Sequence, residues 1–105
     1  MAGKLIEVAR MEDLPPGRML RVTVRGHHYL LANVGGTVYA ADDLCTHEDA
    51  SLATGALHGT CVSCPLHGSR FDLRTGQPLE EPATVPLKTY PVTVRDGAIL
   101  LRAGE

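Results

Sequence analysis

Short segments in which apolar and polar residues alternate dominate the chain. In residues 18–26 (RMLRVTVRG) every second residue is apolar, which is typical of a strand with one buried face. Residues 27–34 and 37–41 follow across glycine turns, so the three segments together predict a β-meander. Residues 90–103 predict a hairpin that turns at an Asp-Gly pair, and residues 4–9 predict an edge strand.

The same pattern predicts an all-β fold. No segment shows ten or more residues of helical periodicity, and seven prolines and eleven glycines interrupt the chain. We therefore expect an antiparallel β-sandwich or small barrel, with residues 1–105 forming a single domain. The strand rhythm fails between about residues 42 and 86, which predicts a loop-rich subdomain built around something other than side-chain core.

Size and charge exclude several classes of function. At 105 residues, the chain is too short for a cofactor domain plus a substrate domain, and it has no nucleophile, phosphate-loop or dinucleotide motif, so we do not expect an enzyme. A net charge of −2 without a basic cluster gives no reason to expect nucleic acid or a membrane surface as partner. No secretory signal or apolar span is present, which predicts a cytoplasmic protein.

Four residues suggest a metal site. Cys45 and His47 are separated by one residue, and Cys64 and His67 follow after 16 intervening residues with two between them. Thiolates with imidazoles select zinc, copper or iron–sulfur chemistry rather than hard cations. The Cys–His, Cys–His order disfavours a zinc finger, in which paired cysteines usually precede paired histidines, without excluding zinc.

The motifs CTH and CPLHG resemble the Rieske pattern C-x-H followed by C-x-x-H, in which two cysteines hold one iron of a [2Fe–2S] cluster and two histidines hold the other. The resemblance extends over residues 55–92, which are similar to the second cluster loop, its following strand and turn, and the proline-containing loop that covers the cluster. With the flanking strands, the whole chain resembles the small Rieske-type ferredoxins that serve bacterial ring-hydroxylating oxygenases.

The resemblance implies one Rieske [2Fe–2S] cluster, with Cys45 and Cys64 on the buried iron and His47 and His67 on the outer iron. It implies a one-electron carrier that takes an electron from a ferredoxin reductase and delivers it to a terminal oxygenase, docking transiently at the His47/His67 edge. Two alternatives remain open at this point. One is a Rieske-like small subunit of a nitrite reductase or similar complex, and the other is a structural zinc module.

The resemblance also bears on the reduction potential. In high-potential Rieske proteins a disulfide joins the loops, and Ser and Tyr hydroxyls donate hydrogen bonds to sulfur. Here Ala50 and Leu66 occupy the disulfide positions and Phe71 replaces the Tyr, whereas Ser69 is retained. We expect a potential toward the low end of the Rieske range of roughly −150 to +300 mV.

Other chemically notable residues have ordinary interpretations. Cys61 forms a C-x-x-C with Cys64 but falls on the strand entering the second loop, which predicts a half-buried structural thiol. His58 precedes a glycine turn and is expected to be solvated, and surface positions account for His27 and His28.

Surface side chains near the first motif predict how partners dock. The acidic residues there are expected to be solvated charges, with a steering patch for a basic partner as the alternative; they are Asp42, Asp43, Glu48 and Asp49. Leu66 and Leu52 are candidates for apolar contact with a partner.

Overall fold

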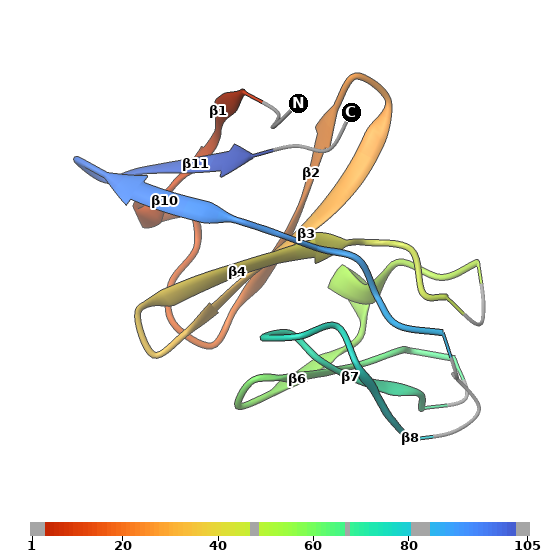
Figure 1. Cartoon of the computed structure of the whole chain (residues 1–105). Helices are drawn as coiled ribbons and strands as arrows, with labels where there is room; N and C mark the ends of the chain where they lie inside the picture. The colour runs from red at the N-terminus through yellow and green to blue at the C-terminus, as the bar shows by residue number, and fades with distance from the viewer. Residues whose placement is uncertain (1–3, 47–48, 67, 81–84, 103–105) are drawn as a thin grey trace.

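The fold is described by a computed structural model that covers residues 4–46, 49–66, 68–80 and 85–102. These residues form eleven strands and two short 3-10 helices, and no α-helix lies among them (Figure 1). The elements are β1 (Leu5–Arg10), η1 (Met11–Asp13), β2 (Met19–Val24), β3 (His27–Val34), β4 (Thr37–Asp42), η2 (Leu52–Thr54), β5 (Ala56–His58), β6 (Cys61–Ser63), β7 (Arg70–Asp72), β8 (Pro78–Glu80), β9 (Thr89–Tyr90), β10 (Val92–Arg95) and β11 (Ala98–Arg102).

Three antiparallel sheets make up the described structure, which confirms the predicted all-β class. Their strand orders are β1-β11-β10, β2-β3-β4-β9 and β5-β6-β7-β8. The predicted meander is β2, β3 and β4, and the predicted hairpin is β10 and β11, with β1 at the edge of their sheet.

Three of the hairpin turns have a positive φ at both central residues, one of them at Gly35 (60°) and Gly36 (100°) between β3 and β4. Arg25 and Gly26 have φ values of 52° and 81°, and Asp96 and Gly97 have φ values of 51° and 78°. Turns of this kind match the right-handed twist of the flanking strands and therefore favour two-residue connections. The Asp-Gly pair predicted this geometry, whereas arginine is an uncommon residue at a positive φ.

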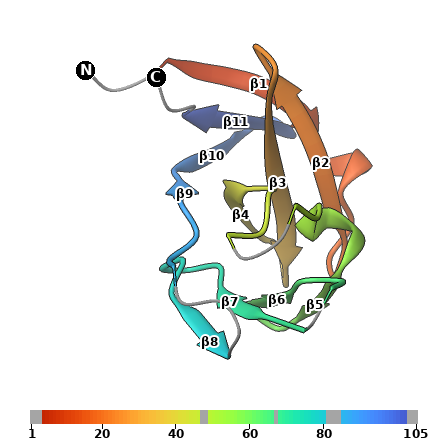
Figure 2. The same cartoon turned by 90° about the vertical axis from the view of Figure 1, so that its right-hand side faces the viewer.

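The sheet containing β3 is packed on both faces. Five consecutive residues of β3, from Tyr29 to Asn33, are buried. Because side chains alternate along a strand, Leu30 and Ala32 enter one core while Tyr29 and Leu31 enter the other. Figure 2 shows β3 between the sheet of β1, β10 and β11 and the sheet of β5–β8.

The two cores differ in composition. One, which we call the cysteine-side core, consists of Leu30, Ala32, Ala41, Cys45, Ala50, Leu52, Val62, Cys64, Phe71, Leu73 and Leu87. The other, the terminal-sheet core, consists of Leu14, Tyr29, Leu31, Val38, Ala40, Ile99 and Leu101. Both predicted cysteine ligands therefore lie in one core, and the opposite core contains neither.

The sheet β5–β8 lies in the region where the strand rhythm failed. Its four strands have three residues each, and three residues are too few for a period of two to be recognised. The prediction of a loop-rich region therefore missed these strands individually.

The turn between β7 and β8 is organised by Asp72. Its carboxylate accepts hydrogen bonds from the backbone N–H of Arg74 at 2.9 Å and from the Arg74 guanidinium at 3.1 and 3.0 Å. Its backbone carbonyl accepts the N–H of Gly76 at 2.6 Å. The Arg74 side-chain and backbone hydrogen bonds lower the pKa of Asp72, because they stabilise the charged carboxylate.

We expect Asp72→Asn to lower the melting temperature by a few degrees at pH 7. Because the folded-state pKa of Asp72 lies below its unfolded value, the carboxylate contributes stability above pH of about 4, and this contribution is lost as the pH falls through the folded-state pKa. The difference between variant and wild type should therefore narrow on acidification. Thermal melts between pH 7 and pH 3 measure it, with Asp96→Asn, on an exposed turn, as control; a difference independent of pH would contradict the assignment.

Candidate metal centre

Two loops with the same closing hydrogen bond present the predicted cysteines. The backbone N–H of Cys45 donates to the carbonyl of Ala50 at 3.0 Å, and that of Cys64 donates to the carbonyl of Ser69 at 2.7 Å. Four residues lie between the bonded pair in each loop. The first loop follows β4 and the second connects β6 to β7, and both project toward the same end of the molecule, at the right in Figure 1.

The cysteines lie inside the protein and the described loop tips lie outside. Cys45 and Cys64 are each 3% exposed and belong to the cysteine-side core, whereas Thr46, Pro65 and Leu66 are exposed. This placement suits thiolates that hold the buried side of a metal group. His47 and His67, the other two predicted ligands, lie outside the described residues.

Two of the four predicted ligands lie outside the described residues, and the described residues alone form no complete metal site. No three His, Cys, Asp or Glu side chains come together as a metal site among residues 4–46, 49–66, 68–80 and 85–102. The arrangement can therefore be judged from the two thiols and from the groups that surround them.

Ser69 supplies an independent test of whether this site fits a metal–sulfur group. The residue is fully buried, and its hydroxyl has no hydrogen-bond partner in the described part of the protein. Leaving a buried hydroxyl unsatisfied costs about 1–3 kcal/mol, so such groups normally have a partner. An inorganic sulfide next to the loop would accept this hydrogen bond. The donor set therefore fits an iron–sulfur cluster.

Phe71 closes the cysteine-side core behind the second loop. It lies on β7 and is fully buried. Its ring has no polar atom, so it fills the core but supplies no donor to sulfur. No hydroxyl is therefore present where the Rieske resemblance places the Tyr that is associated with high potential.

Asp43 fixes residues 51–53, where the chain leaves the first loop, through hydrogen bonds. Its carboxylate accepts hydrogen bonds from the Ser51 hydroxyl at 2.6 Å and from the backbone N–H of Ala53 at 3.0 Å. Its own carbonyl accepts the N–H of Leu52 at 2.7 Å. Asp43 is 2% exposed, so the interpretation of this residue as a solvated charge is wrong. A short polar side chain just before a loop often bonds to the backbone that follows.

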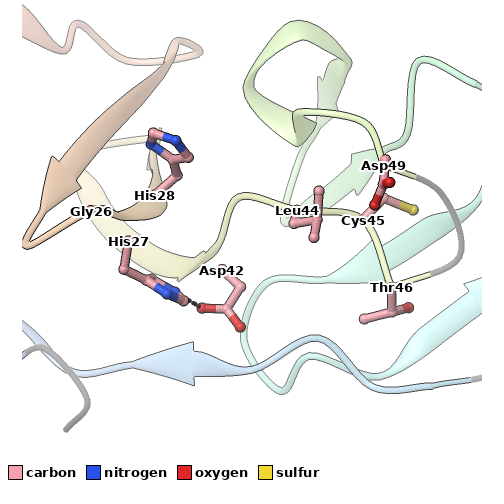
Figure 3. Close-up of a pocket in the computed structure, with 8 residues that line it drawn as sticks. All are labelled: Gly26, His27, His28, Asp42, Leu44, Cys45, Thr46 and Asp49. Atoms are coloured by element: carbon pink, nitrogen blue, oxygen red, sulfur yellow. Dashed lines mark hydrogen bonds and ion pairs between the residues drawn. The ribbon is translucent and has the colours of Figure 1, made fainter.

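A groove of about 690 Å³ runs beside the first loop (Figure 3). It is lined by Gly26, His27, His28, Asp42, Leu44, Cys45, Thr46 and Asp49. The sulfur of Cys45 points away from the two histidines, toward the other side of the loop. The groove therefore flanks the predicted ligand loop without exposing its thiol to the histidines.

Asp42 anchors the groove at the end of β4. One carboxylate oxygen, Oδ1, lies 2.7 Å from Nε2 of His27 and accepts a hydrogen bond from the Tyr90 hydroxyl at 2.6 Å. Burial raises the pKa of Tyr90, and the hydrogen bond to Asp42 raises it further. The phenol therefore stays protonated and remains a donor through the neutral range. His27, predicted at the surface, is exposed, and its ring is within hydrogen-bonding distance of Asp42.

The remaining histidines and Cys61 occupy ordinary positions. His58 is exposed at the end of β5, and His28 is exposed with its ring 2.8 Å from the Thr23 hydroxyl. Cys61 is half-buried on β6, opposite Asp72 on β7. These positions agree with the structural interpretations of all three residues. Of the other acidic residues, Asp49 is exposed and Glu48 lies outside the described residues.

The predicted apolar contact residues divide into one that is exposed and one that is not. Leu66 is 47% exposed on the second loop. Leu52 is fully buried in the cysteine-side core, so its assignment to a docking surface is wrong: it begins η2, whose fold back onto the core the sequence pattern did not indicate. Leu44 and Val85, at 55% and 56% exposed, were missed.

Residues 85–88, which we call the connecting segment, join the first loop to the β7–β8 turn. The N–H of Leu87 donates to the carbonyl of Gly76 at 2.6 Å, and the N–H of Asp42 donates to the carbonyl of Lys88 at 2.9 Å. Gly76 has a φ of +83°, and a Cβ at this position would collide with the Leu87 carbonyl. The two backbones thus meet at a contact that only glycine permits.

No helix in the described residues is long and apolar enough to cross a membrane.

Comparisons with known proteins agree with the geometry. The ferredoxin component of the naphthalene 1,2-dioxygenase system of Pseudomonas putida is 42% identical over 101 residues, which cover 96% of this chain and 97% of that protein. The ferredoxin of carbazole 1,9a-dioxygenase from Nocardioides aromaticivorans IC177 superimposes with a TM-score of 0.92 at 35% identity, covering 97% of this chain and all of that one.

A third comparison concerns a complex. A structure of reduced oxygenase with oxidized ferredoxin in carbazole 1,9a-dioxygenase matches with a TM-score of 0.89 at 37% identity, over 93% of this chain and 92% of that one. The Rieske [2Fe-2S] domain family matches residues 4–91, and a domain of this family implies one Rieske-type cluster. The chain therefore belongs to the Rieske [2Fe-2S] domain family, and over its full length it is similar to the ferredoxin components of dioxygenase systems.

Proposed function

We propose that the protein is a one-electron carrier that passes electrons from a ferredoxin reductase to the terminal oxygenase of a ring-hydroxylating system. Full-length similarity to dioxygenase ferredoxins supports this role, and the ferredoxin–oxygenase complex supports the oxygenase as a partner. A carrier of this kind is not itself an enzyme. The same similarity favours it over a permanently bound nitrite reductase subunit, and a zinc module has no support from the family.

The ligand set is part of this proposal. Cys45 and Cys64 would hold the inner iron and His47 and His67 the outer iron. When bound, a Rieske cluster supplies reversible one-electron chemistry at a potential raised by its two neutral histidine ligands. The observation that carries the assignment is that both thiols are buried in one core, and that each lies in a loop closed by the same kind of backbone hydrogen bond. The surrounding apolar side chains exclude water from these thiols.

We infer that residues 1–105 form a single Rieske domain in which residues 42–86 are the cluster-binding subdomain. The separate sheet β5–β8 supports this division, because its strands and loop all fall within that range. A cytoplasmic location belongs to the same proposal, since the reducing cytosol keeps unbound cysteines as thiols until they bind a metal, whereas oxidising compartments favour disulfides.

The proposed docking surface is the end of the molecule that carries both loops. Leu44, Leu66 and Val85 expose apolar side chains on the first loop, the second loop and the connecting segment. A carrier that alternates between two partners needs only a small interface, below about 1,200 Å². Apolar contacts of this size give affinity without a permanent complex.

The decisive experiment for the function is reconstitution. The purified protein should contain about two irons and two acid-labile sulfides per chain and should give a rhombic EPR signal only after reduction. Added to a reductase and a ring-hydroxylating oxygenase, it should restore product formation that the two enzymes alone do not give. A loaded cluster that restores no turnover would reject the carrier role while leaving the cluster assignment intact.

Serine replacement of the cysteines tests the ligand set. Cys45→Ser and Cys64→Ser should each abolish or strongly reduce the iron and sulfide content, because a thiolate ligand is lost from the inner iron. Cys61→Ser is the matched control and should retain the cluster, since Cys61 is placed on β6 away from the loop tips. Loss of the visible absorption in Cys61→Ser would show that the ligand set is wrong.

Ser69→Ala should lower the reduction potential. The Ser69 hydroxyl would donate to sulfur and favour the reduced, more negative cluster. A hydrogen bond that favours the reduced state by about 1.4 kcal/mol shifts a one-electron couple by about 59 mV. Protein-film voltammetry measures the shift, with Ser63→Ala as control because the Ser63 hydroxyl bonds to the Ala56 carbonyl instead. A potential that does not fall would mean that Ser69 has another partner.

Leu66→Ser should weaken docking. Removing one apolar contact from the interface is expected to raise the apparent KM for this protein in the oxygenase assay roughly fivefold. Val94→Ser is the control, because Val94 is 45% exposed on β10, away from the two loops (Figure 1). Equal effects of the two substitutions would indicate a general loss of stability and not a local contact.

A further inference from the structure

The two ligand loops must be held at a fixed position relative to one another without a covalent link between them. Ala50 and Leu66 occupy the positions at which the Rieske resemblance places a disulfide between the loops. Each loop is closed by its own backbone hydrogen bond, from Cys45 to Ala50 and from Cys64 to Ser69. Each of these bonds lies within one loop, so neither fixes the position of one loop relative to the other.

The connecting segment supplies the missing link. Its Leu87 lies in the cysteine-side core with both thiols, and the N–H of Leu87 is bonded to Gly76 in the turn of the β7–β8 hairpin. Since β7 begins directly after the second loop, this bond ties the segment to the element that positions Cys64. At its other end, the Lys88 carbonyl accepts the N–H of Asp42 at the base of the first loop.

Thr46 joins the first loop to the same segment near the loop tip. Its hydroxyl donates to the backbone carbonyl of Val85 at 2.8 Å, across 39 residues of sequence. The loop is thus bonded to the segment twice, at Asp42–Lys88 and at Thr46–Val85, with the two chains running in opposite directions. Thr46 also lies in sequence between Cys45 and His47, the two proposed ligands of this loop.

Resting on the ligand set of the proposed function, we propose that Thr46 is a positioning residue for the cluster. Its hydroxyl fixes the first loop against the connecting segment, and the connecting segment is in turn fixed to the hairpin of the second loop. The hydrogen bond from Thr46 to Val85 therefore sets one Cys–His pair relative to the other. In this chain it does noncovalently what a disulfide between the loops would do.

A pair of substitutions at Thr46 tests this role. Thr46→Val has nearly the same shape but lacks the hydroxyl, whereas Thr46→Ser keeps the hydroxyl. Thr54→Val is the matched control, because the Thr54 hydroxyl is also exposed and also donates to a backbone carbonyl, that of Ser51 at 2.7 Å. The readouts are the EPR g values of the reduced protein and the rate at which visible absorption is lost in the presence of an iron chelator.

We expect Thr46→Val to lose the cluster about fivefold faster than wild type, the factor that corresponds to one ordinary hydrogen bond, and to shift the g values. Thr46→Ser and Thr54→Val should match wild type in both measurements. A Thr46→Val protein that loads no cluster while the other two load fully would be the extreme form of the same result.

Three outcomes would overturn the proposal. Wild-type behaviour of Thr46→Val would show that the hydroxyl is not needed, and a Thr46→Ser defect equal to that of Thr46→Val would assign the effect to packing of the methyl group. An equal defect in Thr54→Val would make the effect a general loss of surface hydrogen bonding. A wild-type protein without iron and sulfide would instead remove the proposed function itself, and the inference with it.

Discussion

The double-sided packing of the middle sheet is the constraint on which the rest of the structure depends. Alternate residues of β3 enter opposite cores, so Leu30 and Ala32 pack with the two predicted thiolate ligands while Tyr29 and Leu31 pack with the terminal sheet. A shift of one residue in the register of β3 would exchange the two sets. The first loop begins immediately after β4, the neighbour of β3, and its position is therefore set by the same register.

The sequence predicted the long strands and their turns because these elements carry strong local signals. Alternation is visible over the six residues of β2, and an Asp-Gly pair marks the turn between β10 and β11. The short strands β5–β8 carry no such signal, and their pairing depends on the second loop and on the glycine contact between residues 76 and 87. Long-range contacts of this kind cannot be inferred from a local pattern.

For the site, the motif spacing predicted the two cysteines and their resemblance to Rieske loops. It did not predict what supports them. Asp43 was interpreted as solvated because charged residues are rarely buried, yet it is buried and bonded to Ser51 and Ala53. Leu52 was placed at the surface because the turn of η2 into the core has no distinct sequence signature. The Thr46 hydrogen bond was not foreseen, since its partner is a backbone carbonyl 39 residues away.

The separation of the two cores also has a consequence for the order of maturation. The terminal-sheet core draws its residues from η1 to β4 and from β11, and it includes no cysteine. We therefore expect its strands to pair and exclude water without a metal. Iron and sulfide would then be inserted into a chain whose scaffold already exists, so that only the cysteine-side half depends on their arrival. We expect the newly made protein to have an ordered terminal-sheet core and an incompletely folded cysteine-side core until the cluster is inserted.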